Sequence, residues 1–158
     1  MATKPTLLIF GYGNPSRGDD ALGPLLLDRL EAAGLPGVEC LTDFQLQVEH
    51  ALDLEDRELA LFIDAHLSCP PPYTFTALRP ETDRSYTTHA MSPAAVLQVF
   101  SEIHHRSPPP AFLLSVRGQR FELGENLSPA ALANLDAAAE FALRLCARPE
   151  PAYWSSLL

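Results

Sequence analysis

The stretch LLIFGYGNPSRGDDALGP, residues 7–24, decides the fold of this chain. It begins with a short apolar run that ends at a glycine, which is typical of a buried central strand. A glycine-rich turn and two acids, Asp19 and Asp20, then precede a helical pattern of apolar residues. Glycine permits tight turns and close approach of another group. The stretch therefore predicts two carboxylates at a strand-to-helix junction, and the simplest chemistry for such a pair is cation binding.

Outward from this stretch, the chain alternates between predicted strands and helices. We expect strands at residues 6–10, 38–41, 59–63, 73–78 and 111–116, and helices over 22–33, 93–103 and from 129 to about 148. Residues 46–54 are predicted to hold a short helix or turn. The connection from the third to the fourth strand, residues 64–72, is too short for a parallel crossover, so the fourth strand is predicted to be antiparallel. The alternation indicates an α/β layer fold with a mostly parallel sheet.

The last long helix shows the clearest periodicity. Its predicted buried stripe consists of Leu132, Leu135, Ala139, Ala142 and Leu145. Residues 149–158 form a short tail, which we expect to pack against the body because an exposed tryptophan without a partner is unusual. No internal repeat or linker composition divides the chain, so residues 1–158 are predicted to form a single domain.

Composition narrows the class of protein. The 158 residues carry a formal net charge of −9, which argues against a general nucleic-acid binder. The three cysteines are widely spaced and form no CxxC motif, which fits a reducing compartment. The first residues show no signal-peptide pattern, and no apolar run approaches the length of a membrane span. We therefore expect a cytoplasmic protein with neither a membrane nor a nucleic acid as partner.

Acids follow two of the predicted strands directly. Ligands of such sheets bind beyond the carboxyl ends of the strands, so Asp20 and Asp64 are expected to face the same edge. A dinucleotide site is disfavoured, because Ser16 occupies the third glycine position of GxGxxG and the paired acids would repel a pyrophosphate. An ordinary strand-end acid remains the alternative interpretation of Asp64.

Helix capping is the alternative interpretation of Asp19 and Asp20. Pro24 fits only the first turn of a helix, which places the N-cap at Ala21 or later. Asp20 then precedes the cap, and its side chain is free for another task.

Among the histidines, His66 lies two residues beyond Asp64 and His89 lies in a polar loop before a helix. A loop histidine such as His89 is more often a surface residue than a ligand, unless it converges with the acids. The sequence contains neither a GxSxG nor an HExxH motif. What remains is a metal site of carboxylates and imidazole with several open positions.

Three motifs together resemble the hydrogenase maturation endopeptidases, which process the large subunit of nickel–iron hydrogenases. They are GYGNPSRGDDALGP after the first strand, FIDAH at the end of the third and HAMSP before a helix, and the resemblance extends from Leu7 through the last long helix. It implies a three-layer α/β/α sandwich whose five-stranded, mostly parallel twisted sheet carries one antiparallel strand. It also implies that Asp20, Asp64 and His89 are metal ligands, with both aspartates taking part in catalysis.

The segment DFQLQVEHALDL, residues 43–54, resembles the version in relatives that serve cytoplasmic, cofactor-reducing hydrogenases. This resemblance implies that substrate contacts come from the segment and that Asp43 lies near the site. The residues expected to bind substrate are Gly13, Asn14, Gln45, Gln47, His50 and His66.

The resemblance further implies that nickel arrives already bound in the immature large subunit and that another divalent metal can replace it in vitro. The protease recognises that nickel and removes a short C-terminal extension of the precursor. It is expected to be a monomer. We hypothesise that Asp19 or Asp43 acts as general base. Two alternatives stay open: a non-enzymatic metal-binding assembly module on the same scaffold, and an autonomous metallopeptidase of broad specificity.

Overall fold

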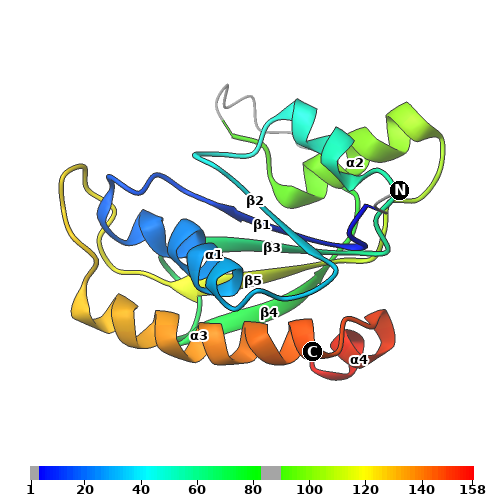
Figure 1. Ribbon diagram of the computed structural model, residues 1–158. Helices are drawn as coiled ribbons and strands as arrows, with labels where there is room; N and C mark the ends of the chain where they lie inside the picture. Colours follow the sequence, from blue (N-terminus) through cyan, green and yellow to red (C-terminus); the bar gives the residue numbers. More distant parts are fainter. Residues whose placement is uncertain (1–3, 83–89) are drawn as a thin grey trace.

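β1 (Leu7–Tyr12) is an internal strand of a five-stranded sheet whose order is β2-β1-β3-β5-β4 (Figure 1). The computed structural model describes residues 4–82 and 90–158. The other strands are β2 (Val38–Asp43), β3 (Leu59–His66), β4 (Tyr73–Leu78) and β5 (Ala111–Arg117). β1 pairs in parallel with β2 and β3, β3 pairs in parallel with β5, and β4 runs antiparallel to β5. The predicted mixed sheet with one antiparallel strand is confirmed.

Helices cover both faces of this sheet. The α-helices are α1 (Leu22–Ala32), α2 (Pro93–His104), α3 (Pro129–Ala147) and α4 (Pro151–Ser156), and the 3₁₀ helices are η1 (Gly18–Ala21) and η2 (Val48–Leu54). In Figure 1, α2 lies above the sheet, while α3 and α4 lie below it. The N-cap of α1 is Ala21, as Pro24 predicts, so Asp20 precedes the helix.

Strand alternation divides the core between the two faces. Along β1, Leu7 and Ile9 pack with the leucines of α1 and the inner side of α3. Leu8 and Phe10 point the other way and pack with residues of η2 and α2. This period of two residues is what a strand buried on both faces requires. The result is the three-layer α/β/α sandwich that the resemblance implied.

α3 differs in one respect from the predicted stripe. Leu135, Ala139, Ala142 and Leu145 are buried, whereas Leu132 is 48% exposed, because it lies at the outer margin of the apolar face. The C-terminal residues do more than end this helix. Pro151 begins α4, and the buried Trp154 donates its indole N–H to the carbonyls of Leu145 and Arg148 at the end of α3. The expected packing of the tail is confirmed.

All three cysteines are free, and Cys69 and Cys146 are buried. Among the helices within residues 4–82 and 90–158, none has the length and apolarity that crossing a membrane demands.

Candidate functional site

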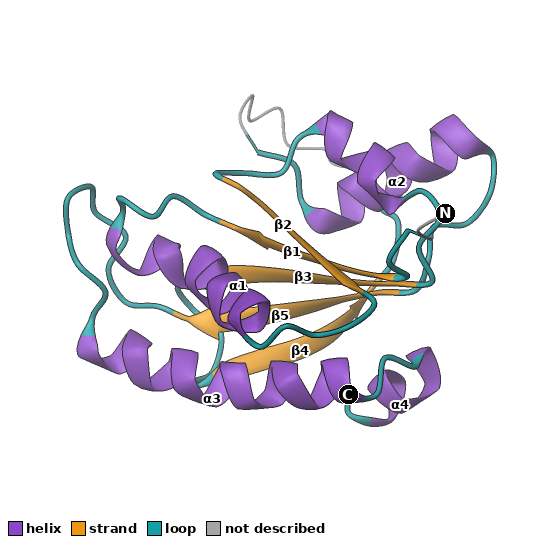
Figure 2. Ribbon diagram, viewed as in Figure 1, coloured by secondary structure: helices purple, strands orange, loops and turns teal. Residues whose placement is uncertain are grey.

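The carboxyl ends of β1, β2, β3 and β5 meet at one edge of the sheet, and long loops gather there (Figure 2). Asp64 lies near the carboxyl end of β3. Asp20 lies in η1, which follows β1. Gly23, at the start of α1, lets these segments approach closely, because a Cβ there would lie 2.4 Å from the carbonyl oxygen of Tyr12 and 2.9 Å from that of Ile63. The predicted convergence of strand ends is therefore present.

Asp64 is a largely buried carboxylate with one oxygen engaged and one open. The hydroxyl of Tyr12 donates to Oδ2 at 3.3 Å. Oδ1 is buried and makes no hydrogen bond within the described residues. Ser115 lies opposite Asp64 in the β3–β5 pair, and its hydroxyl is close enough to influence the Asp64 carboxyl without making a hydrogen bond of good geometry to Oδ1. A buried carboxylate oxygen without a donor is costly, so this arrangement calls for a ligand.

Charge and burial around Asp64 agree with that interpretation. Burial raises the pKa of the Asp64 carboxyl above its ordinary value, and the negative charge of Asp20 adds to the shift. The hydroxyls of Ser115 and Tyr12 oppose the increase without cancelling it. The pKa of Tyr12 is raised well above its usual range by burial and by the negative charge of Asp64, so its phenol stays a donor at neutral pH.

Asp20 is held from the side of the glycine turn. Its Oδ2 accepts a hydrogen bond of 2.7 Å from the backbone N–H of Asn14. Gly13 makes this contact possible, because its φ is +147° and a Cβ there would lie 2.0 Å from the carbonyl oxygen of Asp20. The amide of Gly13 donates to the carbonyl of Asp43 at 3.1 Å, which joins the turn to the end of β2. Gly13 and Asn14 thus shape the site through their backbones.

Asp20 and Asp64 are neighbouring carboxylates, and one of them has a buried oxygen without a hydrogen-bond donor. Such a pair suits a divalent cation better than an anion. They form only part of a coordination shell. Within the described part of the chain, no three His, Cys, Asp or Glu side chains gather as a metal site. The third predicted ligand, His89, lies outside the described residues. The assignment of Asp20, Asp64 and His89 as ligands therefore stays a prediction, with which the donor chemistry of the two aspartates is consistent.

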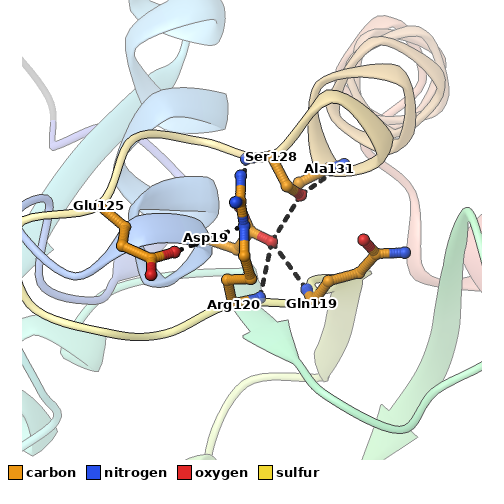
Figure 3. A network of polar contacts seen from close by, with 6 residues as sticks. All are labelled: Asp19, Gln119, Arg120, Glu125, Ser128 and Ala131. Carbon is orange, nitrogen blue, oxygen red and sulfur yellow. Dashed lines mark hydrogen bonds and ion pairs between the residues drawn. The ribbon is translucent and has the colours of Figure 1, made fainter.

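Asp19 has a different environment from the one expected for a general base (Figure 3). Its side chain is fully buried and accepts four hydrogen bonds from the β5–α3 loop and the helix start. The donors are the backbone N–H groups of Gln119 (2.7 Å), Arg120 (3.0 Å) and Ser128 (2.7 Å) and the Ser128 hydroxyl (2.7 Å). Burial alone would raise the pKa of Asp19, but these donors outweigh it and the pKa lies below its ordinary value.

A buried carboxylate whose pKa is lowered and whose two oxygens already accept four hydrogen bonds is a poor proton acceptor. The hypothesis that Asp19 is the general base therefore has no support in the structure, and neither does capping of α1 by its side chain, since no side chain caps that helix.

Asp43 is the other candidate base, and its position is more open. Its side chain is 44% exposed at the carboxyl end of β2. Oδ1 accepts from the N–H of Phe44 at 2.7 Å, and Oδ2 lies 3.3 Å from Nε2 of His50. The Nδ1 atom of His50 accepts from the N–H of Gln47 at 2.8 Å, which leaves Nε2 as the protonated nitrogen that faces Asp43.

His50 is therefore buried with both ring nitrogens engaged inside the chain. This arrangement speaks against the predicted direct contact of His50 with substrate, and it makes His50 a support for Asp43. Gln47 is exposed and Gln45 is half-buried in the same segment. His66 is exposed at the end of β3, where its Nδ1 accepts from the amides of Ser68 and Cys69 at 3.1 Å each. Substrate contacts of Gln45, Gln47 and His66 stay predictions.

Tyr12 and Ser115 are the residues at this edge that sequence reasoning missed. Tyr12 lies between two glycines, a pattern typical of a turn, although its position at the end of a buried strand is a signal that its side chain is held in place. Ser115 lies inside an apolar strand, and only the register of β3 against β5 places it opposite Asp64.

Comparison with known proteins gives a consistent result at the level of the fold. No protein-family model and no curated protein matches the sequence. Among solved structures, the chain is similar to the nickel–iron hydrogenase maturation protease HycI from Thermococcus kodakarensis, with 22% identity, a TM-score of 0.72 and coverage of 91% of this chain and 94% of that one.

Two Escherichia coli structures are also similar, and each comparison covers 87% of this chain and 90% of the other. The hydrogenase maturating endopeptidase HybD has 23% identity and a TM-score of 0.67. A protein described as an endopeptidase has 28% identity and a TM-score of 0.65. These similarities confirm the resemblance found in the sequence motifs: the chain has the fold of the hydrogenase maturation proteases.

Proposed function

We propose that this protein is an endopeptidase that removes the C-terminal extension from the nickel-loaded large-subunit precursor of a nickel–iron hydrogenase. The observation that carries the proposal is the pair Asp20 and Asp64 at the carboxyl edge, in which Oδ1 of Asp64 is buried without a hydrogen-bond partner. The fold shared with the maturation proteases supports the same activity.

In this proposal the metal is part of the substrate. Asp20 and Asp64, with His89 as the third ligand, complete the coordination of nickel that the precursor already holds. Oδ1 of Asp64, which has no hydrogen-bond partner within the described residues, and the carboxylate of Asp20 are the groups that we assign to it as ligands. Nickel bound there would act as a Lewis acid or as a recognition element beside the scissile bond.

Peptide hydrolysis requires a water oxygen to bond to the scissile carbonyl carbon while the C–N bond breaks and the amine leaves with a proton. Asp43 remains the candidate for accepting the water proton, because its carboxylate is exposed at the same edge and is oriented by His50. Asp19 is not a candidate, since its side chain is buried and its four donors hold its pKa below the ordinary value. We therefore assign Asp43, and not Asp19, the role of general base.

We assign the substrate to the cytoplasmic, cofactor-reducing class of hydrogenases because residues 43–54, DFQLQVEHALDL, resemble the version of this segment in the proteases that serve that class. Phe44, Val48 and Leu52 of this segment are exposed, and the segment begins at Asp43, the last residue of β2. Such side chains suit a protein surface as partner better than a small solute.

The experiment compares three substrates: nickel-loaded precursor, nickel-free precursor and unrelated peptides. Cleavage of the loaded precursor alone supports the proposal. Binding without cleavage would indicate the assembly module, and cleavage of unrelated peptides would indicate an autonomous peptidase. Asp43→Asn tests the general base and should slow cleavage by about 10²–10⁴-fold. Asp136→Asn, an exposed acid on α3 that pairs with Arg29, is the matched control and should leave the rate unchanged.

A further inference from the structure

The structure assigns Asp19 a role that the chemistry of hydrolysis does not require: it is a positioning residue that fixes Asp20 by clamping η1 to the β5–α3 loop. This inference rests on the proposed function only where it concerns the rate of cleavage. The structural part of the inference, that Asp20 shifts when the hydrogen bonds of Asp19 are removed, does not depend on the proposed function.

Two segments far apart in sequence meet at the clamp. The side chain of Asp19 gathers four donors from residues 119–128. Backbone bonds run beside it in both directions: Asp19 N–H donates to the carbonyl of Arg120 at 2.6 Å, Gly18 N–H to that of Glu125 at 3.2 Å, and Gly124 N–H to that of Ser16 at 2.8 Å. The loop and η1 therefore behave as one unit at this edge of the sheet.

The network continues into the start of α3. Ser128 is the N-cap of that helix, and its hydroxyl oxygen accepts from the N–H of Ala131 at 3.2 Å while the hydroxyl proton is donated to Asp19 (Figure 3). Arg120 also pairs with Glu125 at 3.4 Å within the loop. A helix of 19 residues thus anchors the carboxylate of Asp19 through its own cap.

Asp20 follows Asp19 directly, and among the described residues its carboxylate is held by the 2.7 Å bond from Asn14 N–H to Oδ2, while its own N–H donates to the carbonyl of Arg17 at 3.1 Å. Asp19 is thus bonded to the start of α3, while the carboxylate of Asp20 is bonded to the glycine turn at Asn14. Both holds are needed to set a short 3₁₀ segment, because four residues provide few bonds of their own. Loss of the Asp19 hold should let η1 shift relative to Asn14.

Gly118 shows how tightly the loop fits around Asp19. A Cβ at this position would lie 2.9 Å from the Cβ of Asp19 and 2.9 Å from the ring of Phe121. The loop is thus close-packed around the buried acid, and no space is left for a substrate group to reach it. This is the environment of a structural anchor and not of a reacting group.

The test uses Asp19→Asn, which keeps the shape and removes the charge, and Leu30→Val as a control. Leu30 is buried near the end of α1, away from the acids, so its truncation lowers stability without touching the clamp. At a temperature where circular dichroism shows both variants folded, Asp19→Asn should reduce kcat on the loaded precursor by about tenfold or more, with KM unchanged. Leu30→Val should retain the kcat of the unaltered protein.

A second readout needs no substrate. Hydrogen exchange of the Asn14 amide reports its bond to Asp20, and it should become at least about tenfold faster in Asp19→Asn but not in Leu30→Val. Ser128→Ala should change both readouts in the same direction as Asp19→Asn, and Ser128→Thr, which keeps the hydroxyl, should restore them.

An Asp19→Asn protein with normal kcat and a protected Asn14 amide would overturn the inference, whatever its stability. If the unaltered protein cleaves no precursor, the proposed function fails, and Asn14 exchange alone then decides on Asp19.

Discussion

The hydroxyl of Tyr12 lies 3.3 Å from Oδ2 of Asp64, and this bond leaves Oδ1 as the only oxygen of that carboxylate open to a ligand. β1 and β3 are neighbouring parallel strands, so the two side chains are brought together by strand register and not by proximity in sequence. The contact gives the Asp64 side chain a defined orientation, which is what a ligand to a metal requires from its outer partners.

Tyr12→Phe keeps the aromatic ring, and with it the edge-on contact to Phe10 at 6.4 Å between ring centroids, while removing the hydroxyl. We expect processing of the loaded precursor to slow by roughly 10–100-fold, as is usual when the outer partner of a ligand is lost. The free energy of unfolding should fall by about 1–3 kcal/mol, because Oδ2 of Asp64 loses its donor. Denaturant unfolding and a processing assay measure the two effects. A Tyr12→Phe enzyme with unaltered processing would show that the hydroxyl does not orient Asp64.

Asp64→Asn should separate activity from stability. The raised pKa of Asp64 means that folding disfavours its charged form, so the native state is destabilised at pH values above the carboxyl's unfolded pKa. The neutral amide removes that cost, and we expect a thermal midpoint at pH 7 equal to or above that of the unaltered protein. Processing should be lost. A marked drop in the midpoint would instead assign Asp64 a structural role.

Gly13→Ala tests the close approach of the glycine turn to η1. The new Cβ would meet the carbonyl oxygen of Asp20 at 2.0 Å, and φ is +147° at this position. We expect a loss of about 2–3 kcal/mol in the free energy of unfolding, together with loss of processing. Gly34→Ala, just after α1, is the matched control, because φ is +63° there but no atom lies within 4 Å of the new Cβ. Equal effects from both substitutions would show that backbone strain, and not the clash with Asp20, is responsible.

The lowered pKa of Asp19 predicts a pH dependence of stability. A carboxyl whose pKa is depressed by folding contributes stability that is fully present above its unfolded pKa, about 3.9, and is lost as pH falls through the folded pKa. The difference in unfolding free energy between the unaltered protein and Asp19→Asn should therefore be constant from pH 7 to about pH 5 and shrink below pH 4. Urea titrations at fixed pH values measure it. A difference that stays constant down to pH 2 would contradict the assignment.

Much of the layer architecture is predictable from local pattern. The apolar runs before Gly11 and before Asp64 identify two internal strands, since only a strand covered on both faces carries so unbroken an apolar sequence. Pro24 places the N-cap of α1 at Ala21 or later, because proline lacks the N–H that a position beyond the first turn would need, and the observed N-cap is Ala21. The short connection before β4 predicts its antiparallel direction, because a parallel crossover does not fit.

The roles of the acids could not be assigned in the same way. Asp19 and Asp20 are adjacent and chemically identical in the sequence, yet one is buried among four donors from residues 119–128 and the other faces Asp64. Their difference depends on contacts about a hundred residues away, which no local pattern encodes. His50 likewise resembles a surface histidine until the fold brings it beside Asp43.

The sequence by itself therefore determined the order of the layers and the edge at which the acids gather, because hydrophobic periodicity and turn chemistry act over a few residues. Tertiary structure decided which acid is an anchor and which is left open to a ligand. The physical reason is that a carboxylate's role depends on its burial and on the donors around it, and here the donors come from another strand, a distant loop and the cap of the last long helix.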